Sequence, residues 1–386
     1  MPKIAIVAGE ASGDMLGYHL MQALIAERSD LTFIGIAGPK MIGLGAKSLY
    51  PMERLSVRGY VEVLKHLFGL IKLRKNLLVQ LIEEKPDVFI GIDAPDFNFW
   101  LEKKLKSKGI PTIHYVSPSI WAWRKGRIRK IKRAVTHMLA LFPFEQAVYE
   151  NSKIPVDYIG HPLADVLPLE PQVAQTRALL KINTGTIVIA MLPGSRQSEV
   201  SQHASLFVET ALLIQKEYEE TQTNIVQFLV PLITRETRNI FQKAIDAMIA
   251  THPETNLNMQ IMFGHAHDAM EAADIVIVAS GTATLEAALL KKPMVITYRM
   301  PFLSWQILKR MKYLPYVGLP NILAGKFLVP ELLQKDATPQ KLAETTLKLL
   351  GDKNHQKELK QAFTEIHLSL KQNSAQKAAK AILSYL

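Results

Sequence analysis

A single carboxylate in the first half of the chain, Asp93, stands where a catalytic base could work. It comes shortly after the run 87–90, which predicts a buried strand with Asp93 at its carboxyl end. Open α/β sheets bind ligands at this edge, and a carboxylate there can take a proton from an attacking hydroxyl. We therefore interpret Asp93 as catalytic. Alternatively, Asp93 or Asp96 fixes the turn before Pro95 or caps the next helix, and Asp96 is the better placed for capping.

Small and polar residues from 9 to 17 follow the first expected strand and open a helix. Free backbone N–H groups and the helix dipole at such a start favour a phosphate or another anion. The glycines lack the G-x-G-x-x-G spacing of dinucleotide-binding loops, so we expect Glu10 and Ser12 to contact a sugar or phosphate. The alternative is a tight turn in which Ser12 or Asp14 caps the helix.

Two turns in the second half resemble this one. In the first, a glycine turn, the hydroxyl of Ser195 and the guanidinium of Arg196 suit a diphosphate without the help of a metal. The alternative is an exposed arginine on an ordinary strand–helix turn.

In the second turn, the backbone N–H groups and hydroxyls of Ser280, Gly281 and Thr282 can hold phosphate, and Glu286 can accept from a ribose hydroxyl. Alternatively, Glu286 is a first-turn acid stabilised by the helix dipole.

Metal and thiol chemistry find little support among the 386 residues. The absence of cysteine excludes disulfides, thiolate metal sites and a cysteine nucleophile. The D-x-D, H-E-x-x-H and P-loop patterns are also absent, and His265 and His267 lack a third ligand at a metal-binding spacing. We expect neither a metal nor a cofactor.

Parallel sheets must position these turns, because short β-branched runs alternate with longer helical patterns along the chain. The expected strands are 3–8, 32–37, 88–92, 112–116, 137–141, 156–159, 186–192, 225–231, 259–263, 275–279 and 294–298. This pattern predicts an α/β fold of two Rossmann-like units in tandem.

A proline-rich stretch at 160–174 with little periodicity indicates a linker, and we place the boundary near residue 165. The expected domains are an N-terminal Rossmann-like acceptor and membrane-contact domain at 1–165 and a C-terminal Rossmann-like domain at 166–345. Helices at 346–386 are expected to pack back on the N-terminal domain.

The net charge of +11, from 46 Lys and Arg against 35 Asp and Glu, favours anionic partners such as nucleic acid, phosphorylated metabolites or an anionic membrane face. The N-terminus lacks a signal-peptide pattern, and no charge-free stretch of about 18 residues occurs. We expect a cytoplasmic protein whose membrane contact is peripheral.

Apolar residues recur at helical spacing over 57–82, in an arc wider than one core-facing stripe. With lysines on the other side, this pattern suits a helix lying at the surface of anionic lipid. The expected membrane contacts are Val61, Leu64, Leu67, Phe68 and Ile71. The alternative is a helix packed on two sides inside the domain.

Trp121 and Trp123 precede seven cations that end at Arg133. This combination suits a membrane interface or a phosphorylated lipid head group. It equally suits single-stranded nucleic acid, and a solvated basic helix is the plain alternative.

Several strings together resemble one family, the lipid-A-disaccharide synthases. They occur in the same order over residues 3–375, and their conjunction is more specific than any one of them. The strings are VAGEASGD at 7–14, GIDAPDFN at 91–98, HYVSPSIWAW at 114–123, LPGSR at 192–196, SGTATLE at 280–286 and LPN at 319–321.

The resemblance implies a GT-B type glycosyltransferase, with two Rossmann-like domains facing a cleft, that joins UDP-2,3-diacylglucosamine to 2,3-diacylglucosamine 1-phosphate with inversion at the donor carbon. Asp93 is then the expected base, and Arg196, with Ser195 and the 280–282 turn, holds the diphosphate. Glu286 holds the ribose. Ser12 and Asn321 are expected near the cleft. The resemblance also implies an enzyme on the cytoplasmic face of the bacterial inner membrane.

Two other functions remain compatible with the sequence. One is a GT-B enzyme with another lipid-linked acceptor, such as the enzyme that forms the peptidoglycan disaccharide. The other is a nucleic-acid-binding protein, although no nucleic-acid motif occurs and we expect no nucleic acid among the partners. The sequence also leaves open whether Asp96 replaces Asp93 as base and whether the chain forms a homo-oligomer.

Overall fold

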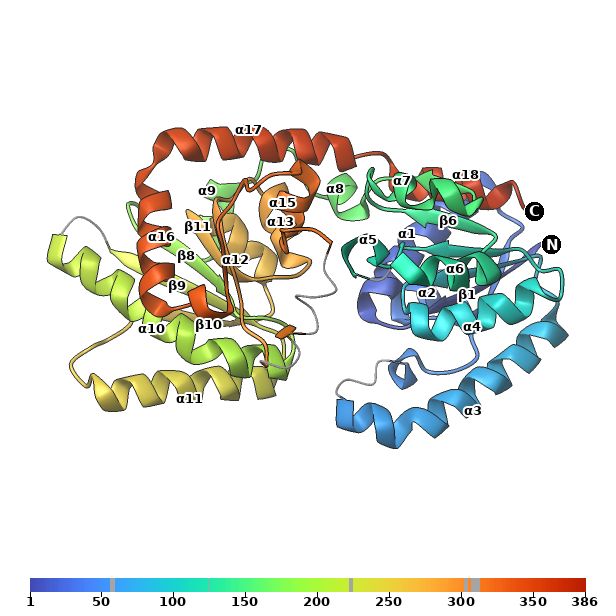
Figure 1. Cartoon of the computed structure of the whole chain (residues 1–386), viewed down its shortest axis with the longest axis horizontal. Coiled ribbons are helices and arrows are strands. Elements are labelled where there is room, and N and C mark those ends of the chain that lie inside the picture. The colour runs from blue at the N-terminus through green and yellow to red at the C-terminus, as the bar shows by residue number, and fades with distance from the viewer. Residues whose placement is uncertain (56–59, 124, 222–224, 302–304, 307–312) are drawn as a thin grey trace. The chain divides into compact units, whose positions relative to one another are not determined.

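The structure is a computed structural model that describes residues 1–55, 60–123, 125–221, 225–301, 305–306 and 313–386, without the side chains of 60–67, 122, 123 and 125. The chain divides into two compact units (Figure 1). Unit 1 comprises Met1–Asp165 and Ser369–Leu386, and unit 2 comprises Val166–Leu368. Each unit contains one parallel β-sheet, which confirms the expected α/β class and the two tandem Rossmann-like units.

The sheet of unit 1 has seven strands in the order β3-β2-β1-β4-β5-β6-β7, and all neighbours are parallel. The strands are β1 (Lys3–Ala8), β2 (Thr32–Ile36), β3 (Lys47–Ser48), β4 (Val88–Ile92), β5 (Thr112–Tyr115), β6 (His137–Ala140) and β7 (Val156–Tyr158). The chain runs outward from β1 to β3 and returns to β4 on the other side of β1. The loops after β1 and β4 therefore flank the point where strand order reverses, where open α/β sheets bind ligands.

The helices of unit 1 include a long amphipathic helix that packs on the sheet along its C-terminal half. They are α1 (Ala11–Glu27), α2 (Pro39–Gly43), α3 (Tyr60–Glu84), α4 (Pro95–Lys106), α5 (Ile120–Trp123), α6 (Ile128–Ala134), α7 (Glu145–Tyr149) and α18 (Ser374–Leu383). Leu73, Leu77 and Leu81 of α3 are buried four residues apart, on one helix face, in a cluster with Phe89 of β4. None of the described helices is long and apolar enough to cross a membrane.

The sheet of unit 2 has six parallel strands in the order β10-β9-β8-β11-β12-β13. The strands are β8 (Ile187–Leu192), β9 (Val226–Leu232), β10 (Met259–Phe263), β11 (Ile275–Ala279), β12 (Met294–Tyr298) and β13 (Glu331–Leu333). The helices that follow α8 (Pro162–Val166) are α9 (Val173–Leu179), α10 (Gln197–Thr221), α11 (Arg235–Thr251), α12 (Ala266–Ala272), α13 (Ala283–Leu289), α15 (Leu319–Ala324), α16 (Pro339–Gly351) and α17 (Lys353–Leu370). The loops after β8 and β11, neighbouring strands, begin the two turns expected to bind diphosphate.

The last helix returns to unit 1, where α18 packs against α1 (Figure 1). Its start is fixed by the Asp165 carboxylate, which accepts hydrogen bonds from the backbone N–H groups of Asn373 at 2.9 Å and Ser374 at 2.6 Å, and from the Ser374 hydroxyl. A carboxylate at a helix N-terminus satisfies free N–H groups and interacts favourably with the helix dipole.

Asp14 performs a similar task at another helix. Its buried carboxylate accepts from the backbone N–H groups of Lys40 at 3.0 Å and Met41 at 3.1 Å, in the first turn of α2. A side chain at Gly38 would collide with this carboxylate, because a Cβ atom there would lie 2.4 Å from Asp14 Cγ. The alternative in which Ser12 or Asp14 caps α1 is therefore not what the structure has: α1 has no side-chain cap, and Asp14 caps α2 instead.

We predict that Asp14→Ala lowers the free energy of unfolding of unit 1 by about 1–2 kcal/mol, because two N–H groups in the first turn of α2 lose their acceptor. Urea denaturation followed by circular dichroism measures the shift. Asp30→Ala, which removes an ion pair with Arg28 at the surface, is the control and is expected to change stability by less than about 0.5 kcal/mol. Equal shifts for both variants would contradict the capping role.

Candidate active site

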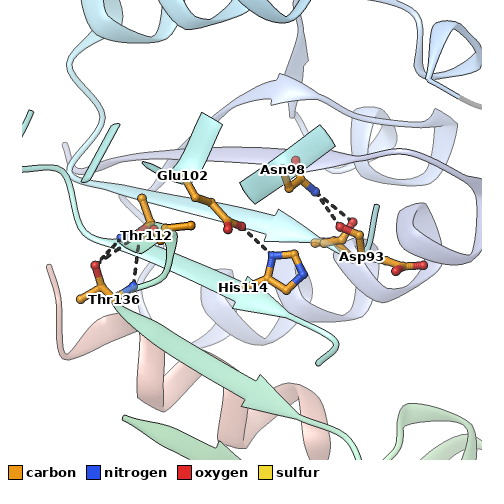
Figure 2. Close-up of polar contacts among 8 residues, drawn as sticks. Asp93, Asn98, Glu102, Thr112, His114 and Thr136 are labelled. Atoms are coloured by element: carbon orange, nitrogen blue, oxygen red, sulfur yellow. Dashed lines mark hydrogen bonds and ion pairs between the residues drawn. The ribbon is translucent and has the colours of Figure 1, made fainter. Parts of the chain in front are cut away.

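Asp93 lies in a strained turn directly after β4. Asp93 and Ala94 have φ angles of 48° and 43°, in the left-handed region that residues with a Cβ rarely adopt. Two hydrogen bonds hold the turn: Asp93 N–H donates to Tyr115 O at 2.9 Å, and the Asn98 amide donates to Asp93 O at 2.8 Å (Figure 2). The Asp93 side chain itself is exposed. Such strain persists only where the surroundings impose it, and it is typical of functional sites.

Two buried polar side chains, one from α4 and one from β5, form a pair close to this turn. Glu102 and His114 are fully buried, and Glu102 Oε1 lies 2.6 Å from His114 Nδ1 (Figure 2). Burial raises the pKa of Glu102 above its ordinary value, while the neighbouring His114 acts in the opposite direction. Gly91 leaves room for the pair, because a Cβ atom there would lie 2.3 Å from Glu102 Oε1. Asn98, Glu102 and His114 were not predicted from the sequence as individual contributors to the site.

The other candidates of unit 1 reach the same edge of the sheet. Glu10 and Ser12 are exposed at the start of α1, where neither side chain caps the helix. Gly9 brings this loop close to the Asp93 turn, because a Cβ atom at Gly9 would lie 3.0 Å from the Cβ atom of Ala94. The two loops thus touch, as expected from the neighbouring parallel strands β1 and β4.

Asp96 differs from its expected role as a cap. The N-cap residue of α4 is Ala94, and no side chain caps this helix. The exposed Asp96 carboxylate instead forms an ion pair with Arg127, with 2.5 Å between Oδ1 and Nη2. The local sequence favours a capping role for Asp96. The structure differs because the ion-pair partner, Arg127, lies 31 residues further along the chain.

In unit 2, the turn after β8 is closed by a carboxylate. Glu199 Oε2 accepts from the backbone N–H groups of Ser195 at 3.1 Å and Arg196 at 3.2 Å, and Arg196 Nη1 donates to Glu199 Oε1 at 2.9 Å. Gly194 has a φ of 123°, and a Cβ atom there would lie 2.6 Å from Glu199 Cβ. Glu199 therefore occupies backbone N–H groups of the turn that we expected to hold a diphosphate, while the Arg196 side chain remains 70% exposed.

A buried histidine that was not predicted from the sequence joins this turn to β12. His203 Nδ1 lies 3.0 Å from Pro193 O, and its Nε2 accepts from Arg299 N–H at 2.9 Å. These partners require a neutral ring with its proton on Nδ1. Burial is the main cause that lowers the pKa of His203, and the nearby acceptors oppose it. In the sequence, the signal for this contact is the position of His203 in the expected helix, seven residues after Arg196.

The turn after β11 is held from several sides. Ser280 Oγ donates to Val317 O at 3.2 Å, and Thr284 Oγ1 donates to Gly281 O at 2.7 Å. Gly281 and Thr282 are not buried. Glu286 Oε1 lies 3.3 Å from His267 Nδ1, and this contact raises the pKa of His267. Among the described residues, no group of three His, Cys, Asp or Glu side chains could hold a metal ion.

Asn321, which was expected near the cleft, lies inside unit 2. The side chain is fully buried, its amide donates to Val329 O and Glu331 Oε1, and its oxygen accepts from two backbone N–H groups. All of its hydrogen-bonding groups are thus satisfied within unit 2. Asn321 shapes the segment next to the 280–282 turn, because Glu331 also accepts from the N–H groups of Val317 and Gly318.

The family model of the lipid-A-disaccharide synthetases matches residues 4–384. The chain belongs to this family. The lipid-A-disaccharide synthase of Methylobacillus flagellatus is 62% identical over 386 residues, which cover all of both chains. The activity is therefore that of a lipid-A-disaccharide synthase, a glycosyltransferase of lipid A biosynthesis.

Solved structures agree on the fold of this synthase. The kitacinnamycin glycotransferase superposes with a TM-score of 0.62 at 15% identity, covering 100% of this chain and 99% of the other. A UDP-GlcNAc 2-epimerase from Neisseria meningitidis, bound to UDP-GlcNAc, gives 0.62 at 13% identity, with 100% and 99% coverage. Together with the two parallel sheets, these neighbours show the GT-B type of fold.

We predict that Asn98→Ala lowers kcat by about 100-fold with little change in the KM of either substrate, because the Asp93 turn loses the amide that fixes its carbonyl. Steady-state kinetics of the purified synthase measure both constants. The control is Asn258→Ala, which removes a similar bond to Val226 O at 2.8 Å in unit 2. Equal kcat values for the two variants would show that Asn98 has only a structural role.

We also predict a pH dependence from His203. Its pKa is lower in the folded than in the unfolded state, so its contribution to stability is present above about pH 6.5 and is lost as the pH falls through the folded pKa. Urea denaturation of unit 2 between pH 7 and pH 5 should show a shallower pH dependence for His203→Gln than for the wild type. Replacement of the exposed His252 by glutamine is the control, and an unchanged slope in His203→Gln would contradict this account.

Proposed function

We propose that the protein transfers 2,3-diacylglucosamine from UDP-2,3-diacylglucosamine to the 6-hydroxyl of 2,3-diacylglucosamine 1-phosphate. The products are UDP and the β-1′,6-linked lipid A disaccharide 1-phosphate. Family membership supports the reaction class, and the similarity to lipid-A-disaccharide synthases such as that of Methylobacillus flagellatus supports these substrates. The observation that carries the chemical assignment is the exposed Asp93 carboxylate in a strained turn at the switch point of the unit 1 sheet.

The reaction converts an α-linked donor into a β-linked product, so it proceeds by one displacement with inversion. In this mechanism Asp93 takes the proton of the acceptor 6-hydroxyl, and the oxygen attacks C1 of the donor sugar. The bond from C1 to the diphosphate oxygen breaks, and UDP leaves with the electron pair. A carboxylate is suited to this task if it lies within hydrogen-bond distance of the hydroxyl.

The leaving diphosphate needs donors and positive charge. The exposed Arg196 guanidinium, Ser195 and the 280–282 turn supply both, at neighbouring strand ends in unit 2. Glu199 now accepts from the same backbone N–H groups, and a diphosphate would replace its carboxylate there. Glu286 is proposed to accept from the ribose, and the UDP-GlcNAc in the Neisseria meningitidis neighbour supports a UDP site in this fold.

Both substrates carry acyl chains, so the enzyme must act at a membrane surface, which we propose is the cytoplasmic face of the inner membrane. Phe68, near the N-terminal end of α3, is 83% exposed, and Ile71 is half-buried. The remaining expected contacts, Val61, Leu64 and Leu67, lie outside the residues whose side chains are described. Exposed apolar residues beside cations suit peripheral binding to anionic lipid.

Trp121 is less available than expected for such a surface. Its indole N–H donates to Glu145 Oε1 at 3.2 Å, and its ring meets the Phe144 ring edge-on, with 5.0 Å between the ring centres. Glu145 is buried and also accepts from the N–H groups of Leu141 and Phe142. These contacts argue equally against a free stacking platform for nucleic-acid bases, which need exposed aromatic faces.

We predict that Asp93→Asn lowers kcat by about 10²–10⁴-fold while the KM of the donor changes little, because asparagine keeps the shape and tolerates the left-handed backbone but cannot act as a base. UDP release from UDP-2,3-diacylglucosamine, with and without the 1-phosphate acceptor and with a chelator, measures the effect in detergent micelles. Acceptor-dependent release that survives the chelator is the expected behaviour of the wild type.

The comparison variant is Asp96→Asn, which breaks the ion pair with Arg127 and should leave kcat within about tenfold of the wild type. If the loss of kcat followed Asp96 and not Asp93, the base would be Asp96. Absence of UDP release by the wild type with this substrate pair would refute the proposed acceptor or donor.

A further inference from the structure

A cavity of about 380 Å³ lies in unit 1, between α3, α4 and α6. Its volume falls within the range of small-molecule sites. On α4 the lining residues recur at helical spacing, so that the cavity follows one face of that helix from its first turn onward. The lining residues are Arg74, Pro95, Asp96, Phe99, Trp100, Lys103, Arg127, Lys130 and Arg133.

The charges around this cavity are strongly unbalanced, since five cations face a single carboxylate. That carboxylate, Asp96, is engaged by Arg127. Among the described residues, no acidic side chain forms an ion pair with Lys103, Lys130 or Arg133, all of which are exposed. Like charges placed together repel one another, and an anion bound among them relieves this repulsion.

Arg74 contributes a cation to this cavity from α3. Its guanidinium lies 4.5 Å from the centre of the Trp100 ring and donates from Nη1 to Asp96 O at 3.3 Å. Its Nε is buried and has no hydrogen-bond partner within the described part of the chain. Burial lowers the pKa of Arg74. An unsatisfied buried donor is costly, and Arg74 adds its positive charge to the lining of the cavity.

The chemistry of the walls indicates the class of ligand. Arginine forks and lysine ammonium groups together are typical of phosphate recognition, and Phe99 and Trp100 add an apolar wall. The cavity is larger than a phosphate alone needs, so it suits a phosphate attached to a sugar. Its first lining residues, Pro95 and Asp96, follow the candidate base Asp93 almost directly in the chain.

We propose that this cavity binds the phosphate monoester of the acceptor sugar. The inference rests on the proposed function, because it assigns the acceptor 1-phosphate a place in unit 1. A phosphodiester head group of a bilayer lipid presents related chemistry, but the monoester carries more negative charge and better matches five cations. No residue of this cavity takes part in the proton transfer assigned to Asp93, so binding and chemistry can be measured separately.

The test uses the full-length chain and the double variant Lys103→Ala/Lys130→Ala, which removes two exposed cations from two helices that face the cavity. We expect the KM for the 1-phosphate acceptor to rise at least about tenfold, because two charge-assisted contacts to phosphate are lost. The KM for the UDP-sugar should stay within about twofold. With an acceptor that lacks the 1-phosphate, wild type and variant should show the same KM.

The matched control is Lys108→Ala/Lys132→Ala, which removes the same charge from exposed positions that do not line the cavity. An equal rise of the acceptor KM in this control would reduce the effect to net charge and overturn the proposal. An equal rise of the KM with both acceptors would also overturn it.

Binding to phosphatidylglycerol vesicles should be the same for wild type and test variant. If the variant lost vesicle binding while its acceptor KM stayed unchanged, the cavity would hold lipid head groups and the proposal would fail.

Titration calorimetry with glucosamine 1-phosphate examines the cavity without turnover. We expect binding to the wild type and at least about tenfold weaker binding to the test variant. If the wild type bound this ligand but released no UDP, the proposed function would fail and the phosphate site would stand. If it released UDP but did not bind the ligand, the phosphate site would fail and the proposed function would stand.

Discussion

The parallel direction of the strands is the constraint on which the candidate site depends. Because neighbouring strands end at the same edge of a sheet, loops distant in sequence are brought together there. In unit 1 this places the loop after β1 against the turn after β4, close enough that a side chain at Gly9 would crowd Ala94. In unit 2 it places the turns after β8 and β11 side by side. The chemistry then needs only exposed side chains on loops whose positions are already fixed.

The positions of these loops depend on buried polar groups, which stabilise a fold less well than apolar packing does. Asn98 holds two carbonyl groups at the end of β4, and the Glu102–His114 pair fills the space behind it without satisfying every one of its atoms. Asn321 and Glu331 hold the segment beside the second turn of unit 2 in the same way. Partly satisfied polar networks cost stability and define geometry, which fits a catalytic scaffold better than a core.

The sequence predicts the fold well, whereas several contacts around the candidate site do not follow from it. Long apolar strands such as β1 and β11 are visible from composition, whereas the short β3 and β13 at the sheet edges carry too few residues for a pattern. The position of Asp93 at a strand end follows from periodicity. The roles of Asp14, Asp96 and Asn321 do not, because their partners lie at other places in the chain and depend on tertiary packing. Local preferences for capping are weak priors that such contacts override.

The placement of α18 has a consequence for biosynthesis. Unit 1 is made of two stretches of chain separated by the whole of unit 2, and its last helix is tied to Asp165 and packed on α1. On the ribosome, residues up to 165 must therefore wait for about 200 further residues, roughly 10–40 s at ordinary elongation rates, before α18 can dock. During that interval the face of α1 that α18 covers stays exposed to solvent. This is therefore the stage at which the nascent chain most needs a chaperone.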